Sequence, residues 1–142
     1  MSDQINLEVS IDINARISEV WDALINPDLI REYFFGTEAV STWEVGEPIM
    51  FRGTWEGKAY EDKGIILKNN TEKEFQYSYW SSFSGTEDKP ENYATITYKV
   101  ATKGNGTTLT VMQSGFKTED QKEHSKQNWT MVLENIKSIM EG

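Results

Sequence analysis

The first clear pattern along the chain is the alternation of apolar and polar residues in "INLEVSIDI", residues 5–13. Alternation at every second position predicts a β-strand with one face in the core and one in solvent. In "ISEVWDALI", residues 17–25, the apolar positions instead recur at i, i+3, i+4, i+7 and i+8, which predicts an amphipathic helix. Asn26 and Pro27 then supply a helix cap and a first-turn proline, so a second short helix is expected over residues 28–35.

Turn-forming stretches follow at intervals that suit an antiparallel meander. They predict further strands near residues 37–43, 49–55, 59–68, 74–82, 92–102 and 107–114. Because side chains alternate along a strand, residues of equal parity share a face. The expected inward sets are Phe75, Tyr77 and Tyr79; Ile96, Tyr98 and Val100; Leu109, Val111 and Gln113; and Ile49, Phe51 and Trp55, in a strand where Gly53 allows a bulge.

The most strongly helical stretch comes last, in "QNWTMVLENIKSIM", residues 127–140. Burying its apolar side is favourable by on the order of 10 kcal/mol, before the loss of chain entropy is subtracted. Only the inner face of the sheet is large and apolar enough to receive it. The expected fold is therefore α+β: a curved seven-stranded antiparallel sheet wrapped around a long C-terminal helix, with two short helices after the first strand. A straight helix cannot follow a curved sheet along its whole length, so a cavity is expected between them.

Three stretches carry a resemblance to a known family: "EVWDALINPDLIREYF" at 19–34, "GTTLTVMQSGF" at 106–116, and the closing helix. They resemble the START-like, or Bet v-like (SRPBCC), helix-grip superfamily, and within it the group named after the activator of the ninety-kilodalton heat-shock protein ATPase. Tyr33 and Phe34 stand where that group usually has Trp-Phe. The superfamily includes lipid carriers, hormone receptors, polyketide cyclases and co-chaperone domains, so the resemblance implies the fold and leaves the function open.

The length and the charge of the chain limit the classes of function that it can have. A chain of 142 residues predicts one domain, 1–142. The net charge is −9 and the basic residues are scattered, so neither nucleic acid nor an anionic membrane is an expected partner. The chain has no cysteine, and His124 is its only histidine, so we expect no metal and no cofactor. The sequence has neither a basic N-terminal stretch nor a long apolar run. We therefore expect no membrane insertion, and we expect a cytoplasmic location.

The aromatic content is the main sequence evidence for a ligand. Six Phe, six Tyr and five Trp exceed what a solid core of this size needs, and tyrosine hydroxyls suit a cavity with a few polar groups. The leading hypothesis is a non-catalytic binding module for a small, mostly apolar or aromatic molecule, such as a lipid or a polyketide-like metabolite. The expected ligand-binding residues are Phe34, Phe51, Trp55, Tyr77, Tyr79, Tyr98, Gln113, Trp129 and Leu133.

Two other functions stay open. The family resemblance implies a co-chaperone-like module that contacts a heat-shock chaperone ATPase. A cyclase- or dehydratase-type enzyme would instead need a carboxylate inside the cavity, and either Glu61 or Asp62 could supply it, because strand parity does not settle which points inward. Gln113 is either a polar anchor for a ligand or the partner of a neighbouring tyrosine or backbone group. The loop over residues 81–92, with Phe83, either gates the cavity or is a loose surface loop.

Overall fold

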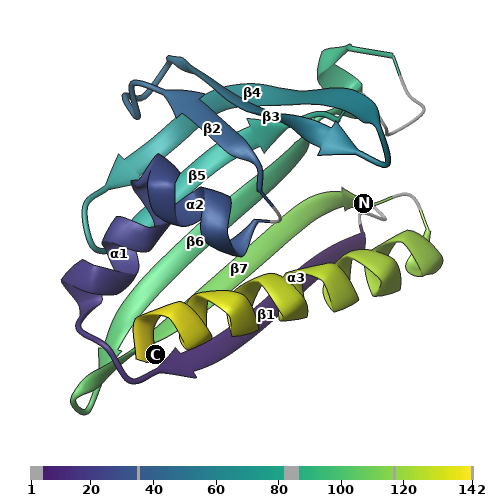
Figure 1. Ribbon diagram of the computed structural model, residues 1–142. Helices are drawn as coiled ribbons and strands as arrows, with labels where there is room; N and C mark the ends of the chain where they lie inside the picture. Colours follow the sequence, from purple (N-terminus) through teal and green to yellow (C-terminus); the bar gives the residue numbers. More distant parts are fainter. Residues whose placement is uncertain (1–4, 35, 82–86, 117, 142) are drawn as a thin grey trace.

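The computed structural model describes residues 5–34, 36–81, 87–116 and 118–141, and the side chain of Trp55 lies outside the described part. It confirms the predicted α+β helix-grip fold (Figure 1). One antiparallel seven-stranded sheet has the strand order β1-β7-β6-β5-β4-β3-β2. The elements are β1 (Ile5–Ile13), α1 (Ile17–Ile25), α2 (Pro27–Tyr33), β2 (Glu38–Ser41), β3 (Pro48–Trp55), β4 (Lys58–Asn70), β5 (Glu74–Tyr79), the 3-10 helix η1 (Pro90–Asn92), β6 (Ala94–Lys103), β7 (Gly106–Phe116) and α3 (Glu119–Glu141).

Local signals set the ends of α2. The side chain of Asn26 accepts a hydrogen bond from the amide of Asp28 at 3.0 Å, and Pro27 occupies the first helical position, as predicted. The helix ends at Tyr33, two residues earlier than the sequence suggested. Gly36 follows with φ of 81°, a left-handed conformation that glycine adopts readily after a helix, and the chain turns there into β2.

The β3–β4 hairpin is regular, so the bulge that Gly53 allowed is absent from it. Gly53 pairs with Tyr60 in an unbroken register, and the register shift of β4 falls between Ile66 and Lys68 instead. The glycine serves a packing role, because a Cβ there would lie 2.5 Å from the hydroxyl oxygen of Tyr60. The Tyr60 ring therefore lies directly over the backbone of β3.

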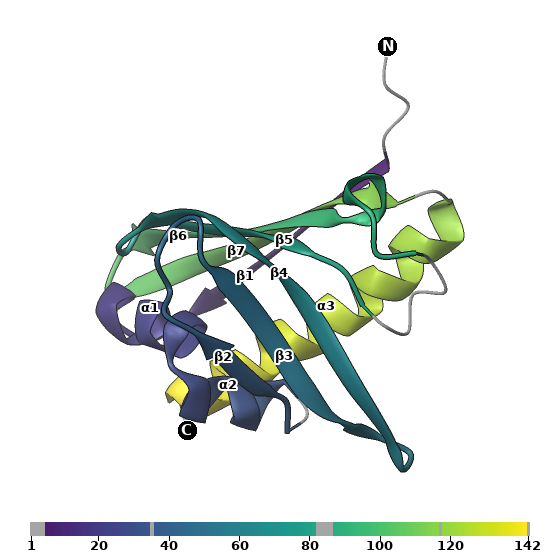
Figure 2. The same ribbon diagram turned by 90° about the horizontal axis from the view of Figure 1, so that it is seen from above.

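The long helix α3 packs chiefly against β1 and β7, and also contacts α1 and α2. Figure 2 shows all three helices on the same side of the sheet. The amide of Gln121 donates to the hydroxyl of Thr118 at 3.1 Å, which caps the start of α3. None of the described helices is long and apolar enough to cross a membrane. The buried residues of α3 are Trp129, Val132, Leu133 and Ile136, all on the predicted apolar face.

The predicted inward faces of the strands are confirmed wherever the structure describes them. Tyr79 and Gln113 are half-buried, and the other described members are buried. The core lies between this inner face, α1, α2 and the apolar side of α3. The buried members are Ile49, Phe51, Phe75, Tyr77, Ile96, Tyr98, Val100, Leu109 and Val111.

Candidate ligand-binding site

The inner face of the sheet has two chemically different ends. Along β4 the inward positions run from Ile66 to Tyr60, and along the antiparallel neighbour β5 they run from Phe75 to Tyr79. At one end only apolar and aromatic side chains gather, and α1 and α2 add to them; we call this the apolar end. It comprises Leu24, Ile30, Tyr33, Ile49, Ile66 and Phe75. At the other end hydroxyl and carboxyl groups gather; we call this the polar end. It comprises Thr37, Tyr60, Asp62, Tyr79 and Ser81.

Five aromatic side chains lie between the two ends and contact one another in a closed cycle, which we call the aromatic cluster. The ring centroids are 6.2 Å apart for Phe34 and Phe51, 5.7 Å for Phe51 and Tyr77, and 6.3 Å for Tyr77 and Tyr98. Trp129 closes the cycle with centroids 5.8 Å from Tyr98 and 6.1 Å from Phe34, both in edge-to-face geometry. All five residues belong to the predicted ligand-binding set, and the fold brings them together from the C-cap of α2, from α3 and from three strands.

The space between the aromatic cluster and the apolar end is small. Its volume is about 10 Å³, and Phe34, Phe51, Tyr77 and Tyr98 are among its lining residues. A space of this size has room for about one water molecule. In this conformation the rings therefore fill most of the region that they surround, and a ligand there would have to displace one of them.

The structure settles which of two adjacent carboxylates points inward. Glu61 lies on the outer face of β4, half-exposed, and forms an ion pair with Arg52 at 3.0 Å. Asp62 lies on the inner face and is 9% exposed. Its position in the register is directly opposite Phe51 on β3. Residues directly opposite on one face have Cβ atoms roughly 5 Å apart, so the Asp62 carboxylate lies beside the aromatic cluster.

Among the described residues, only one oxygen of the Asp62 carboxylate has a hydrogen-bond partner. The hydroxyl of Tyr79 donates to Oδ2 at 2.6 Å. Oδ1 is buried and has no hydrogen-bond partner among the described residues. Burial, followed by the negative charge of Asp62 and the hydrogen bond to it, raises the pKa of Tyr79 well above its usual range. Tyr79 thus stays a hydrogen-bond donor, and the open oxygen of Asp62 is an acceptor.

Two further pairs of polar groups lie near the aromatic cluster. The indole Nε1 of Trp129 donates to Oε1 of Gln113 at 2.7 Å, a partner from α3 that neither alternative for Gln113 had named. The hydroxyls of Thr37 and Tyr60 are hydrogen-bonded to each other. Strand parity could not identify the Gln113 partner, because Trp129 comes from α3 and its reach depends on how the helix docks.

Of the other predicted site residues, Tyr79 and Gln113 border the aromatic cluster: the ring of Tyr79 lies 6.2 Å from that of Phe51, and Gln113 is bonded to Trp129. Leu133 is buried between α3 and the sheet, at 1% exposure. The side chain of Trp55 and all of Phe83 lie outside the described residues. Sequence reasoning missed Trp43, whose ring lies 5.9 Å from that of Phe75 and lines the small space. The predicted strand over residues 37–43 includes Trp43, but β2 ends at Ser41 and the backbone of Trp43 is left-handed, with φ of 67°. Strand parity therefore could not place its side chain.

These features define a helix-grip protein of the START-like (SRPBCC) superfamily. The family model described as Activator of Hsp90 ATPase homolog 1-like protein matches residues 14–141, and the chain belongs to that family. The solution structure of ChR145 from Cytophaga hutchinsonii is 42% identical, with a TM-score of 0.87, and the match covers 99% of this chain and 97% of that one.

More distant structures share the fold alone. The Aha1 dimer from Colwellia psychrerythraea is 17% identical, with a TM-score of 0.74 and coverage of 96% of both chains. DynU16, from the dynemicin biosynthetic locus, is 15% identical, with a TM-score of 0.80 and coverage of 99% of this chain and 48% of that one. The comparison with curated proteins found no match.

Proposed function

We propose that the protein is a binding module for a small, mostly apolar or aromatic molecule, held against the aromatic cluster at its polar side. One observation carries this proposal: Oδ1 of Asp62 is buried beside aromatic rings without a partner among the described residues. A buried polar atom without a hydrogen bond is costly, and native proteins rarely retain one without a use for it. A ligand that places a donor there and a ring against the cluster would satisfy both features.

Phe34 is the ring that such a ligand would displace most easily. It follows α2 directly as its C-cap, and its side chain is half-buried, whereas the other four members of the cluster are buried. Its neighbours in the cluster are Phe51 and Trp129. Aromatic pairs of this kind contribute roughly 0.5–1.5 kcal/mol each, so a ligand ring in the same position would recover what the displaced side chain loses.

The test is a thermal-shift screen of the purified protein against small aromatic and lipid-like compounds, with native mass spectrometry to detect a co-purifying molecule. A ligand that binds the native state alone raises the melting temperature saturably. We expect one chemical class to do so with one molecule bound per chain. The proposal would be overturned if no class shifted the melting temperature and no molecule co-purified.

Two matched variants locate the binding site. Phe51→Leu keeps the interior filled but removes a ring from the aromatic cluster, so we expect it to weaken binding by about tenfold, the effect of losing 1–1.5 kcal/mol of ring contacts. Ile65→Ala changes the outer face of β4, where Ile65 is 49% exposed, and should leave binding unchanged. Equal loss in both variants would place the ligand elsewhere.

A second candidate function is a co-chaperone-like module that binds a heat-shock chaperone ATPase. The family description supports it, and so does the small volume of the interior, about 10 Å³, which suits a module that acts through its surface. Val40 on β2 and Ile65 and Leu67 on β4 are 43%, 49% and 41% exposed, so the outer face of this part of the sheet offers apolar contacts.

Ile65→Ala separates the two candidates. If the second candidate is correct, adding the wild-type protein to a purified ninety-kilodalton heat-shock chaperone changes its rate of ATP hydrolysis, and Ile65→Ala reduces that change. An unchanged rate at saturating protein would remove the co-chaperone candidate. Phe51→Leu serves as the reverse control, because its substitution lies on the inner face.

A further inference from the structure

We propose that the polar end recognises a protonated amine, so that the ligand is a small molecule with an apolar or aromatic body and an ammonium group whose N–H donates to Oδ1 of Asp62. This inference rests on the proposed function and names the class of its ligand. It depends on the hydrogen bonding of the carboxylate, the pairing of the nearby cations, and the aromatic surroundings.

Hydrogen bonds fix the carboxylate so that one oxygen stays open. Tyr79 donates to Oδ2 of Asp62 at 2.6 Å, and Ser81 is in turn hydrogen-bonded to the Tyr79 hydroxyl. Tyr79 is the last residue of β5 and Ser81 follows it closely, so Tyr79 holds the carboxylate and Ser81 supports the Tyr79 hydroxyl. Oδ1 is buried and has no partner among the described residues. The site therefore accepts a hydrogen bond from whatever lies on the opposite side.

The basic residues nearest to Asp62 in the strand pair are engaged elsewhere. Arg52 pairs with Glu61 at 3.0 Å, and Lys63 pairs with Asp88. Both carboxylate partners and both cations are substantially exposed. A buried carboxylate without a countercharge is unfavourable, and a ligand cation that donates to it forms a charge-assisted hydrogen bond. The described part of the chain thus provides the anion of a buried ion pair without its cation.

The surroundings of Asp62 favour an organic cation over a hydrated metal ion. Phe51 lies opposite it in the register, and the ring centroid of Phe51 is 6.2 Å from that of Tyr79. Aromatic faces attract ammonium groups, most strongly where water is excluded. His, Asp and Glu side chains in the described part of the chain form no group of three or more that could hold a metal. A single carboxylate with aromatic neighbours is typical of amine recognition.

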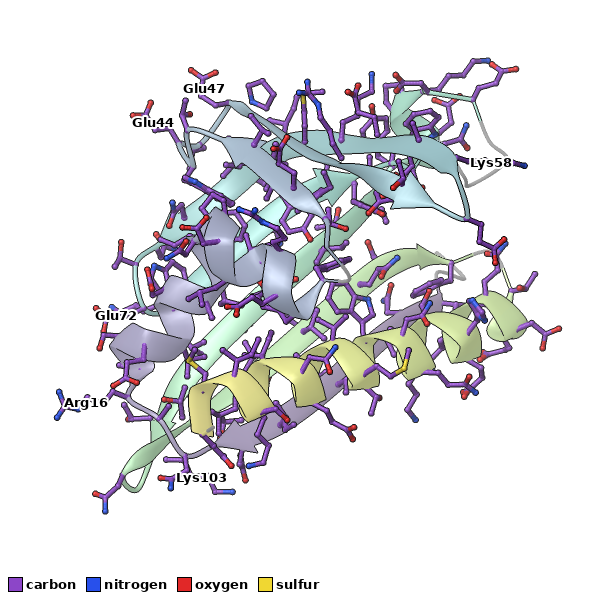
Figure 3. The ribbon with its side chains drawn as sticks, in the orientation of Figure 1. Arg16, Glu44, Glu47, Lys58, Glu72 and Lys103 are labelled. Atoms are coloured by element: carbon purple, nitrogen blue, oxygen red, sulfur yellow. The ribbon has the colours of Figure 1, made fainter. Side chains whose placement is uncertain are left out.

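The charge of the whole chain would assist the approach of a cation. The net charge is −9. Figure 3 shows that the labelled side chains Arg16, Glu44, Glu47, Lys58 and Lys103 point away from the body of the molecule. Asp62 differs from them because its carboxylate points into the fold. A surplus of negative charge raises the local concentration of cations and disfavours carboxylate ligands.

The experiment is a calorimetric titration of the wild-type protein at pH 7 with three probes of similar size: 2-phenylethylamine, 2-phenylethanol and 3-phenylpropanoate. We expect the amine to bind at least about tenfold more tightly than the alcohol, the ratio that a hydrogen bond to a charged group provides. The anion should bind most weakly. Equal binding of the amine and the alcohol would overturn the amine inference and leave the proposed function standing, whereas failure of all three probes and of the aromatic screen would overturn both.

Asp62→Asn removes the charge and keeps the shape of the side chain. We expect it to abolish the preference for the amine over the alcohol, with binding of the alcohol retained. Glu61→Gln is the matched control, because it removes a neighbouring carboxylate on the outer face and should leave the preference unchanged. A preference that survives in Asp62→Asn would place the amine elsewhere and contradict the inference, and an amide NMR spectrum of each variant confirms that it is folded.

Discussion

The apolar and polar ends of the inner face lie on the same strands but differ in how their side chains are satisfied. At the apolar end Ile66 is fully buried and Phe75 is 1% exposed, and both belong to the core that α1 and α2 help to form. At the polar end Tyr79 is half-buried and Asp62 keeps one oxygen without a described partner. The apolar end thus contributes stability through burial, and the polar end retains a group that burial alone makes unfavourable.

In a helix-grip protein whose interior is nearly filled, this difference points to the polar end as the place of function. The aromatic cluster borders both ends, because its rings line the small space beside the apolar end and Phe51 lies opposite Asp62 in the register. Residues that only support the fold should therefore be costly to remove, whereas Asp62 should be nearly free to replace. The following substitutions and a pH series sharpen that contrast, beginning with the largest expected effect.

Trp129→Ala should lower the free energy of unfolding by about 3–5 kcal/mol, because it removes a buried ring and leaves a void. Trp129 is 6% exposed and contacts both Phe34 and Tyr98. Urea denaturation measures the change. Met131→Ala is the control on the solvent side of α3, where the side chain is 47% exposed, and should change stability by less than about 0.5 kcal/mol. A loss below about 1 kcal/mol for Trp129→Ala would mean that α3 does not pack as described.

Gln113→Ala should cost about 1–3 kcal/mol, because the indole N–H of Trp129 would lose its acceptor at a buried position. The double variant Gln113→Ala with Trp129→Phe tests whether the lost hydrogen bond causes this cost. Phenylalanine has no N–H group that needs an acceptor, so Gln113→Ala should cost less in that background. Denaturation of the two single variants and the double variant gives the coupling between the sites. Costs that simply add would show that the hydrogen bond contributes nothing.

Alkaline pH should lower the free energy of unfolding through the buried tyrosines of the apolar end and the aromatic cluster. Burial raises the pKa values of Tyr33, Tyr77 and Tyr98 above their usual range. Above about pH 10 the unfolded chain releases these protons while the folded chain keeps them. These three tyrosines therefore leave the free energy of unfolding unchanged below about pH 10, and each lowers it above that by about 1.4 kcal/mol per pH unit. Tyr98→Phe removes one of the three tyrosines, so the fall in the free energy of unfolding with pH should be smaller by the contribution of one tyrosine. Urea denaturation between pH 9 and pH 11 measures it. An unchanged slope would contradict the burial of that hydroxyl.

Asp62→Asn should have the smallest effect, within about 1 kcal/mol of wild type and in the stabilising direction. The amide carries no charge to bury, and its oxygen still accepts from Tyr79. Thermal and urea denaturation at pH 7 measure the difference. A loss of several kcal/mol would show that the carboxylate supports the fold, and the contrast between the two ends would then disappear.

Much of the fold follows from the sequence because its signals are local. Period-2 alternation identified β1 and the inward faces of the later strands, and the spacing on α3 identified its buried side. Asn26 and Pro27 fixed the start of α2. The end of α2 was placed two residues too late, because "DLIREYFF" continues in helix-compatible residues and the turn at Gly36 depends on tertiary packing.

The site was less predictable because it depends on contacts between distant segments. Strand parity selected three of the five rings of the aromatic cluster and the helical spacing selected Trp129, but the closed cycle with Phe34 arises only when the end of α2 docks beside α3. The inward direction of Asp62 depends on the register of β3 with β4, and strand parity around "AYEDKGII" did not settle it. The filling of the interior by the rings themselves is likewise a property of packing that composition cannot reveal.

The most direct test of the account is an amide NMR titration of the protein with 2-phenylethylamine. The account predicts saturable shifts of the amides of residues 50–53 on β3 and 60–63 on β4, and of the indole N–H of Trp129, with little change in α1. Shifts confined to α1 and the apolar end, or to the turns outside the inner face, would contradict it, because the ligand would then bind without using Asp62.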